Sequence, residues 1–342
     1  MAEDPEEENA LGLTRGLILT SPKNQYVLDE LVGEGGFGAV WRVYLYKDPT
    51  TRYAVKIEKK TAKRRHSKLK MEISILKLVL KERNKEKRHF TAIIDRGKKD
   101  MFFYLVMQLV GKSIEDLLFD SGASVFSLAT SLGIGIQSME ALEDLHKYGF
   151  VHRDVKPANY ACGLDDKTHV IYLLDFGIAR KYIVDDPDSS MKTPRSTVNF
   201  KGTVRYASLS CHRNKEMGPK DDVESWFYMI VELMNPQGLP WRRLNDRSVV
   251  QRSKEDARTL SNTFYPMFIC RDELQAILTY VDTLDYTDRP DYAYIYETIR
   301  LCAQIDNVNI NDPFDWEKAQ LPAADGNDVE SSHRNSDSNK KK

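Results

Sequence analysis

Two short motifs place acidic and amide side chains at a spacing suited to phosphate chemistry. They are Val151-His152-Arg153-Asp154-Val155-Lys156-Pro157-Ala158-Asn159 and, sixteen residues after Asn159, Asp175-Phe176-Gly177. Asp154 is placed to accept the proton of an attacking hydroxyl, and Asn159 and Asp175 offer the hard oxygens that suit Mg²⁺. Lys156 adds positive charge where negative charge moves toward a leaving oxygen. Chance loop carboxylates could explain either motif alone, but both in this order predict phosphoryl transfer.

A glycine-rich stretch precedes these motifs. Glycines let the backbone approach phosphate oxygens without obstruction by a Cβ atom. Taken alone, the stretch also fits a plain hairpin or a dinucleotide-binding turn. The dinucleotide alternative requires a helix directly after the glycines, whereas residues 41–46 continue as a strand. We therefore expect a flap over the phosphates of ATP, formed by Gly33, Glu34, Gly35, Gly36, Phe37, Gly38 and Val40.

A lysine stands inside an apolar run eighteen residues after Gly38, in Ala54-Val55-Lys56-Ile57. Burying an unpaired ammonium is costly, so Lys56 needs a partner or a ligand. Glu72, on the helix predicted to follow, is the partner we choose, and the alternative is that Lys56 extends to solvent. Lys56 is expected to hold the α- and β-phosphates of ATP while Glu72 fixes its position. Both are candidate catalytic residues.

Hydrophobic periodicity indicates the elements that position these residues. Runs at residues 26–32, 53–57 and 101–107 predict strands. Apolar spacings of three and four predict a helix over residues 68–80, with Leu69, Ile73, Leu76 and Leu80 on its buried face. From about Gly111 the pattern becomes helical, with further predicted elements at residues 132–145, 223–234 and 271–284 and one short strand at 170–174.

The predicted fold class is α+β with two lobes. Residues 23–110 form a small, mainly antiparallel β-sheet lobe with one helix, and residues 111–321 form a larger, mainly helical lobe. The cleft between lobes is a natural ligand site. Acidic residues 1–22 and polar residues 322–342 are predicted to be disordered tails.

Composition narrows the function classes. The formal net charge of the 342 residues is −1, so no nucleic-acid or membrane partner is expected. The acidic N-terminus does not fit a signal peptide, and no apolar run is long enough for a membrane span. Four distant cysteines show no zinc-binding spacing. A monomer in the cytoplasm, and in the nucleus as well, is the expectation.

From about residue 24 to residue 303 the chain resembles the protein kinases. In Gly202-Thr203-Val204-Arg205-Tyr206, Thr203 matches the threonine with which serine/threonine kinases contact the catalytic aspartate and lysine. Ser208-Leu209-Ser210, in place of the usual Ala-Pro-Glu, is similar to the casein kinase 1 superfamily. Residues 106–111, 218–232 and 238–242 are closer to its tau-tubulin kinase branch, whereas Glu224-Ser225 looks more like casein kinase 1 proper.

The resemblance implies a bilobal serine/threonine protein kinase that uses ATP and Mg²⁺, with a C-terminal extension after residue 303. It places Ala54, Met107, Gln108 and Leu109 around adenine, with Met107 at the back and Gln108-Leu109 as the hinge. It also implies that Asp222 braces the catalytic loop, although a carboxylate at a helix N-terminus explains Asp222 equally well. The late arginine that normally pairs with the Ala-Pro-Glu glutamate is Arg289, whose partner here is unknown.

Protein substrates are the implied partners, and relatives often favour acidic or already phosphorylated ones. Arg205 matches one of the basic residues used for this, and Lys201 approximates a second. Residues 56–90 hold fourteen Lys or Arg against four Asp or Glu. This excess fits a solvated surface, or a docking site for an acidic surface such as a tubulin tail on microtubules.

The motifs disfavour two other functions. A catalytically silent pseudokinase scaffold is disfavoured because Lys56, Glu72, Asp154, Asn159 and Asp175 are all present. A small-molecule phosphotransferase would not normally carry the Gly202-Thr203 segment. Five hydroxyl residues of the activation segment, which runs from Asp175 to Ser210, could be phosphorylated: Ser189, Ser190, Thr193, Ser196 and Thr197. Relatives in the casein kinase 1 superfamily generally do not need that step.

Overall fold

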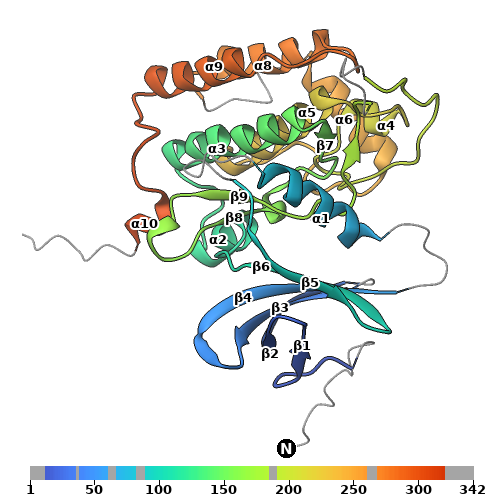
Figure 1. Ribbon diagram of the computed structural model, residues 1–342. Coiled ribbons are helices and arrows are strands. Elements are labelled where there is room, and N and C mark those ends of the chain that lie inside the picture. The colour runs from blue at the N-terminus through green and yellow to red at the C-terminus, as the bar shows by residue number, and fades with distance from the viewer. Residues whose placement is uncertain are drawn as a thin grey trace, which may run out of the picture.

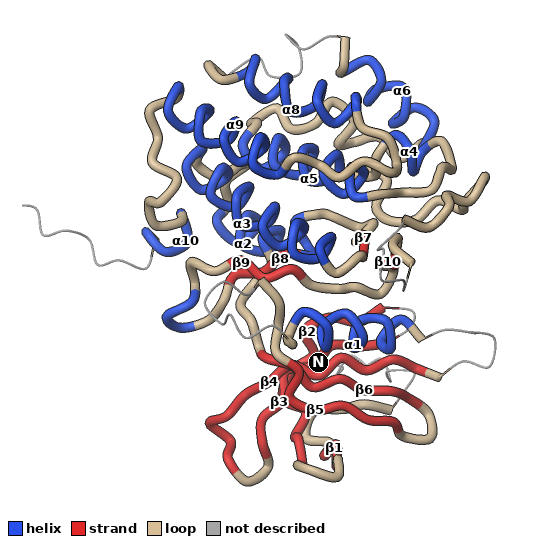
Figure 2. The backbone as a smooth tube through the Cα atoms, turned by 45° about the horizontal axis from the view of Figure 1, so that its top comes forward, coloured by secondary structure: helices blue, strands red, loops and turns tan. Residues whose placement is uncertain are grey.

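The computed structural model describes residues 12–35, 38–60, 67–81, 89–184, 191–259 and 268–319. Strands gather in one lobe and most helices in the other (Figures 1 and 2). The chain therefore has the two-lobed α+β architecture that the sequence predicted.

The small lobe is built on one six-stranded sheet with the strand order β1-β2-β3-β4-β6-β5, in which every pair is antiparallel. The strands predicted at residues 26–32 and 53–57 fall within β2 and β4, and the strand predicted at 101–107 matches β6 with a shift of one residue. The bounds are β1 (Ile18–Thr20), β2 (Gln25–Gly35), β3 (Gly38–Leu45), β4 (Asp48–Lys59), β5 (Ile93–Lys98) and β6 (Phe102–Gln108).

The prediction of a disordered tail over residues 1–22 is wrong for its described part, residues 12–22. Strand β1 pairs with β2, and Leu13 and Leu19 are only 4% and 2% exposed. These apolar side chains pack into the core of the sheet, which outweighs the acidic composition of the preceding residues. Residues 1–11 lie outside the described part of the chain.

Helix α1 (Lys68–Val79) packs beside the sheet and begins where the sequence predicted. Its first turn is capped from β4, because the Glu58 carboxylate accepts hydrogen bonds from the backbone of Lys68 and Leu69. The predicted apolar face is rotated slightly: Ile73 is only half-buried, whereas Glu72 is buried. The residues on the buried face are Leu69, Glu72, Ile75, Leu76 and Val79.

The large lobe is centred on α3 and α5, which carry its most buried side chains, including Trp226. The helices predicted at residues 132–145, 223–234 and 271–284 are confirmed as parts of α3, α5 and α8. The bounds are α2 (Ile114–Ser121), α3 (Leu128–Lys147), α4 (Leu209–His212), α5 (Pro219–Met234), α6 (Arg247–Ala257), α8 (Arg271–Thr283), α9 (Tyr292–Ile305) and α10 (Asp315–Lys318).

Two small sheets line the large lobe where it faces the small one. Strand β9 lies within the predicted strand at 170–174 and pairs with β8, and β10 pairs with β7. The short helical turn η1 (Pro157–Asn159) leads into β8 and carries part of the first motif. The bounds are β7 (Phe150–Val151), β8 (Tyr160–Cys162), β9 (Ile171–Leu173) and β10 (Arg180–Lys181).

One connection between the lobes runs from the end of β6 at Gln108 to the start of α2 at Ile114. Its far end is tied to the large lobe, because Gly111 N donates to Cys162 O and Cys162 N donates to Lys112 O, at 2.8 and 3.1 Å. Two backbone hydrogen bonds therefore fix this connection against β8.

The chain after α9 packs back onto α3. The Asp315 carboxylate accepts hydrogen bonds from Ser127 N and Oγ at 2.7 and 2.6 Å, and the adjacent Phe314 is 4% exposed. The predicted tail at 322–342 lies outside the described residues. None of the helices in the described ranges is long and apolar enough to cross a bilayer.

Candidate active site

The ammonium of Lys56 joins the two lobes. Lys56 lies in the middle of β4, and its Nζ is 2.8 Å from Glu72 Oε2 on α1 and 2.9 Å from Asp175 Oδ1 in the large lobe. Burial alone would lower the pKa of Lys56, but the two carboxylates outweigh that effect and raise it. The predicted pairing of Lys56 with Glu72 is therefore present, and the lysine remains charged.

Asp175 presents an ionised carboxylate to the cleft. Partial burial opposes ionisation, but the neighbouring Lys56 ammonium lowers the pKa of Asp175 to about 2. Its backbone is in the left-handed region, with φ +58°, which is uncommon for a non-glycine residue. The following Phe176 ring stacks on Phe90 at 5.8 Å and meets the edge of His152 at 5.5 Å. These ring contacts hold Asp175 facing Lys56.

Asp154 lies at the centre of a polar cluster. Thr203 Oγ1 donates to Asp154 Oδ1 at 2.8 Å, and Lys156 Nζ is 3.1 Å from Asp154 Oδ2. Lys156 Nζ also donates to Thr203 Oγ1 at 3.2 Å. Asn159 Nδ2 donates to the Asp154 carbonyl at 2.7 Å. Thr203 thus contacts Asp154 of the first motif, 49 residues away in the chain, as the resemblance to serine/threonine kinases implied.

The backbone of the first motif is held by Asp222 at the start of α5. Its carboxylate accepts hydrogen bonds from His152 N at 2.6 Å, from Arg153 N at 2.8 Å and from His146 Nε2 at 2.9 Å. Burial opposes ionisation of Asp222, but these donors lower its pKa. Asp222 therefore braces the catalytic loop, in addition to standing at a helix N-terminus. Arg153 itself has φ +70°, so the brace fixes an unusual backbone.

Gly202 allows the 203–207 segment to lie against that loop. A Cβ atom at this position would be 2.4 Å from Arg153 O and 3.4 Å from Asp154 Oδ1, and φ is +93°. Both the crowding and the left-handed backbone require glycine. Thr203 reaches Asp154 because its neighbour has no side chain.

A cavity of about 560 Å³ opens beside Lys56 and Asp175. Its size is within the range typical of small-molecule sites. Gly35 pairs with Gly38 across the hairpin of β2 and β3, and a Cβ on Gly38 would collide with Ile57 O at 1.9 Å. Gly36 and Phe37, both predicted to bind ATP, lie outside the described residues. The predicted site residues that line the cavity are Gly33, Glu34, Gly38, Val40, Lys56, Asn159 and Asp175.

The predicted adenine end lies along β4 and β6. Ala54 is opposite Met107 in this pair, and both are largely buried. Gln108 N already donates to Ala92 O at 2.9 Å, so an adenine contact at Gln108 would fall on its carbonyl. Leu109 follows directly and is half-buried. None of these four predicted residues lines the cavity beside Lys56.

A second hollow, of about 360 Å³, lies beside Lys156 and Thr203. Arg205 lines it, but its guanidinium is engaged: it lies 3.4 Å from Glu232 Oε1 and donates to Arg242 O at 2.9 Å. Tyr206 Oη also donates to Glu232. Lys201 is exposed and does not line this hollow. The structure therefore separates the two predicted substrate-binding cations.

The partner of Arg289, which the sequence left unknown, is not a carboxylate of the described residues. Arg289 is exposed and forms no ion pair with any described residue. Instead, Glu224 accepts a hydrogen bond from Leu209 N at 3.0 Å and pairs with Arg258 at 2.9 Å. The Glu224–Arg258 pair thus supports the chain at Leu209, where most kinases have Ala-Pro-Glu.

Sequence reasoning missed several charged groups that organise the site. Glu216 pairs with Arg195 at 2.5 Å and lies 3.3 Å from Arg180. Lys254 is fully buried in α6, on the same face as Val250 and Ala257. The signal in the sequence was its spacing: Lys254 lies four residues after Val250 and three before Ala257, which places it on the apolar face of a helix.

Comparisons with known proteins agree with this geometry. Residues 26–298 match the family described as Protein kinase domain. A Caenorhabditis elegans protein whose name places it among the serine/threonine-protein kinases, ZK507.1, is 35% identical over 77% of this chain and 78% of its own length. The C. elegans serine/threonine-protein kinase spe-6 is 32% identical over 80% of this chain and 72% of its own.

A Dictyostelium discoideum protein that is also named as a serine/threonine-protein kinase is 30% identical over 90% of this chain. The matching region spans 59% of that relative's length. The similarity therefore covers both lobes of the fold described above.

We predict that Gly202→Ala lowers the rate of phosphoryl transfer to protein by about ten- to hundredfold, because the new Cβ displaces the Arg153 carbonyl and with it Asp154. Nucleotide affinity, measured at equilibrium, should stay within about twofold because the phosphate cavity is untouched. Gly122→Ala is the matched control: Gly122 has φ +67° but no atom within 4 Å of its Cβ position. A Gly202→Ala enzyme as fast as the Gly122→Ala enzyme would contradict the crowding argument.

Proposed function

Because the chain belongs to the protein kinase domain family and is a serine/threonine protein kinase, we propose that it phosphorylates proteins with ATP and Mg²⁺ in the manner of the casein kinase 1 superfamily. The observation that carries this proposal is the joint placement of Asp154, Lys56 and Asp175. Their contacts with Thr203 and Glu72 are complete in one structure. These five side chains, all within the described residues, come from both lobes and meet at the cleft.

Asp154 is the proposed base. A substrate hydroxyl beside its carboxylate gives up its proton to Asp154 as the hydroxyl oxygen attacks the γ-phosphate. Thr203 and Lys156 hold the carboxylate by its two oxygens, so its orientation is set before the substrate arrives. The Lys156 ammonium also stabilises the negative charge of the transferring group.

Lys56 is the proposed contact to the α- and β-phosphates. Its Nζ lies between two carboxylates at the edge of the 560 Å³ cavity, and Glu72 comes from the helix that packs on the sheet. The ion pair with Glu72 fixes the side chain so that little conformational entropy is lost when phosphate binds. This arrangement supports a role in positioning ATP.

Asn159 and Asp175 fit a magnesium site. Asn159 Nδ2 donates to the Asp154 carbonyl, which turns the amide oxygen toward other ligands, and the Asp175 carboxylate is ionised at neutral pH. One amide and one carboxylate oxygen match the preference of this hard cation. Bound Mg²⁺ would offset the negative charge of the phosphates.

Contacts within the activation segment support activity without its phosphorylation. Arg153 Nε donates to Ile178 O at 2.8 Å, and Glu216 holds Arg195 and Arg180. Arg153 is thus already engaged with the segment. Ser189 and Ser190 lie outside the described residues, whereas the exposed hydroxyls are Thr193, Ser196 and Thr197.

The tau-tubulin kinase-like branch, a cytoskeletal substrate, a monomeric state and a cytoplasmic or nuclear location remain predictions. Residues 61–66 and 82–88 of the basic 56–90 stretch lie outside the described residues. Two described residues of the stretch, Lys77 and Lys81, line a hollow of about 370 Å³ together with two basic residues from outside it, beside Asp95. The basic residues are Lys23, Lys77, Lys81 and Arg96. This hollow supports docking of an acidic partner at the small lobe.

The direct test of the proposed reaction is incubation of the pure protein with labelled ATP, Mg²⁺ and casein. We expect Asp154→Ala to lower the rate by about 10²- to 10⁴-fold, the usual contribution of a positioned base. Asp100→Ala removes an exposed carboxylate outside the cleft and should leave the rate unchanged. Wild-type activity no greater than that of Asp154→Ala would favour the pseudokinase scaffold.

The surroundings of Arg205 support the expected preference for acidic or phosphorylated substrates. Glu232 is a largely buried carboxylate, with 11% of its side chain exposed, and Arg205 neutralises it at the wall of the 360 Å³ hollow. Arg242 lines the same hollow and is exposed. The hollow favours an acidic side chain, because the basic Lys156, Arg205 and Arg242 line it against one carboxylate, Glu115.

We predict that Arg205→Ala lowers kcat/KM for a phosphoserine-primed peptide by about tenfold, since one charge-assisted contact is lost. In the same variant, kcat/KM for the matched peptide with arginine in place of phosphoserine should increase, because Glu232 then lacks its ion-pair partner Arg205. Lys201→Ala should change the ratio between the two peptides less, since Lys201 is outside the hollow. Equal loss on both peptides in Arg205→Ala would show that Arg205 has no part in selectivity.

A further inference from the structure

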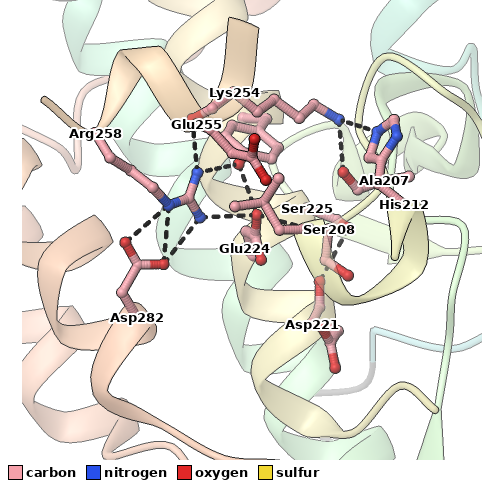
Figure 3. A network of polar contacts seen from close by, with 12 residues as sticks. Ala207, Ser208, His212, Asp221, Glu224, Ser225, Lys254, Glu255, Arg258 and Asp282 are labelled. Carbon is pink, nitrogen blue, oxygen red and sulfur yellow. Dashed lines mark hydrogen bonds and ion pairs between the residues drawn. The ribbon is translucent and has the colours of Figure 1, made fainter. Parts of the chain in front are cut away.

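A lysine ammonium is buried directly behind the 203–207 segment. Lys254, on α6, has no exposed surface and is among the largest fully buried side chains of the described residues. Its Nζ donates to Ala207 O at 2.5 Å and lies 3.2 Å from His212 Nε2 (Figure 3). It also donates to Val204 O at 3.0 Å. Three acceptors therefore surround the three N–H groups of the ammonium.

The rest of this site consists of aromatic rings. Nζ is 4.9 Å from the centroid of Tyr228 and 5.5 Å from that of Trp241, distances at which a cation is attracted to a ring. Trp241 Nε1 in turn donates to Arg205 O at 2.8 Å. Lys254 and Trp241 together thus bind three of the five carbonyls of the 203–207 segment.

No carboxylate within the described parts of the chain forms an ion pair with Lys254. The nearby Glu224 is paired with Arg258 instead, at 2.9 Å. Arg258 also binds Asp282 on α8 at 2.8 Å, so this second network ties α6 to α5 and α8 (Figure 3). Arg258 therefore holds helix α6 in place without Lys254, and the ammonium of Lys254 binds the carbonyls of the 203–207 segment.

We propose that Lys254 is a positioning residue for the protein substrate, which holds the 203–207 segment from behind so that Thr203 meets Asp154 and Arg205 lines the substrate hollow. This inference rests on the proposed function, because it concerns the same kinase reaction. Lys254 touches neither of the two cavities, so its effect must pass through the segment.

The geometry distinguishes this role from simple filling of the core. An apolar side chain of similar length would pack better in a fully buried site, since burying an ammonium is costly. The ammonium instead donates to the backbone carbonyls of Val204 and Ala207, which an apolar side chain could not do. The segment held in this way is also the one that carries Thr203 and Arg205.

The protonation state of Lys254 supports the role. Burial lowers the pKa of its ammonium to about 7, and the charge of Glu224 opposes that effect only in part. The other ionisable groups facing it are His212 and Cys211 on α4, Tyr228 on α5 and Arg258 at the C-cap of α6. Burial and the nearby cations lower the pKa of His212 to about 4, so its imidazole is neutral and can accept a hydrogen bond.

Two pH effects of opposite sign follow. As pH rises through about 7, Lys254 loses a proton and keeps two N–H groups for three acceptors, so the segment loosens and the KM for a protein substrate rises. The unfolded chain keeps its lysine protonated to a pKa of about 10.4. Between these values the unfolded state binds more protons, so Lys254 makes the stability of the folded chain increase with pH.

The test compares wild type with Lys254→Met, using one neutral serine peptide at pH 6.5 and pH 8.5. At pH 6.5 we expect peptide kcat/KM to fall about tenfold or more in the variant, because two buried carbonyls lose their donor. Equilibrium affinity for ATP should stay within about twofold. Peptide KM should rise between the two pH values in wild type but not in Lys254→Met.

Amide hydrogen exchange gives a readout that does not depend on activity. The 203–207 segment should exchange faster in Lys254→Met than in wild type, and faster in wild type at pH 8.5 than at pH 6.5 after correction for intrinsic rates. Lys215→Met, which removes an exposed lysine of the same lobe, should match wild type in every measurement.

The outcomes separate the two proposals. If wild type phosphorylates no peptide or casein, the proposed function fails, and hydrogen exchange still decides the role of Lys254. A folded Lys254→Met protein with wild-type peptide kinetics and exchange would overturn the inference, as would a parallel loss of ATP affinity. Should the variant not fold, a pH-independent peptide KM and exchange rate in wild type would overturn it instead.

Discussion

The ion pairs of Lys56 with Glu72 and Asp175 are the contacts on which the rest of the site depends. They link β4 and α1 of the small lobe to the large lobe through one ammonium. An unpaired charge at this depth would be strongly unfavourable, so the strand, the helix and the Asp175 backbone must take compatible positions. Capping of α1 by Glu58 and stacking of Phe176 on Phe90 and against His152 serve that alignment. The cleft is thus set by charge pairing as well as by packing.

The 203–207 segment is held from two sides. Thr203 joins it to Asp154 in front, and Lys254 with Trp241 joins its carbonyls to the helices behind. This chain lacks the Ala-Pro-Glu glutamate, and its place is taken by Glu224, which pairs with Arg258 under Leu209. Substrate binding therefore depends on buried electrostatic contacts that lie outside both cavities.

The local motifs were predictable because each one carries its chemistry within a few residues. Asp154, Asn159 and Asp175 share a spacing that defines their roles, and the helices of the large lobe follow from apolar periodicity. Strand β1 was missed because its apolar residues lie beside an acidic stretch whose composition suggested disorder. Lys254 was missed because its hydrogen-bond partners are 42 to 50 residues away. Glu216 was missed because its arginine partners are 21 and 36 residues away, and only the folded chain brings these groups together.

The measurement that tests the central account most directly is single-turnover phosphorylation of casein by wild type and Glu72→Gln at saturating ATP and Mg²⁺. If the Lys56 ion pairs set the geometry of the cleft, removing one carboxylate should slow the transfer step by about ten- to hundredfold even with nucleotide bound. A Glu72→Gln protein that transfers phosphate at the wild-type rate would contradict this account, since the pairing of the two lobes through Lys56 would then be dispensable.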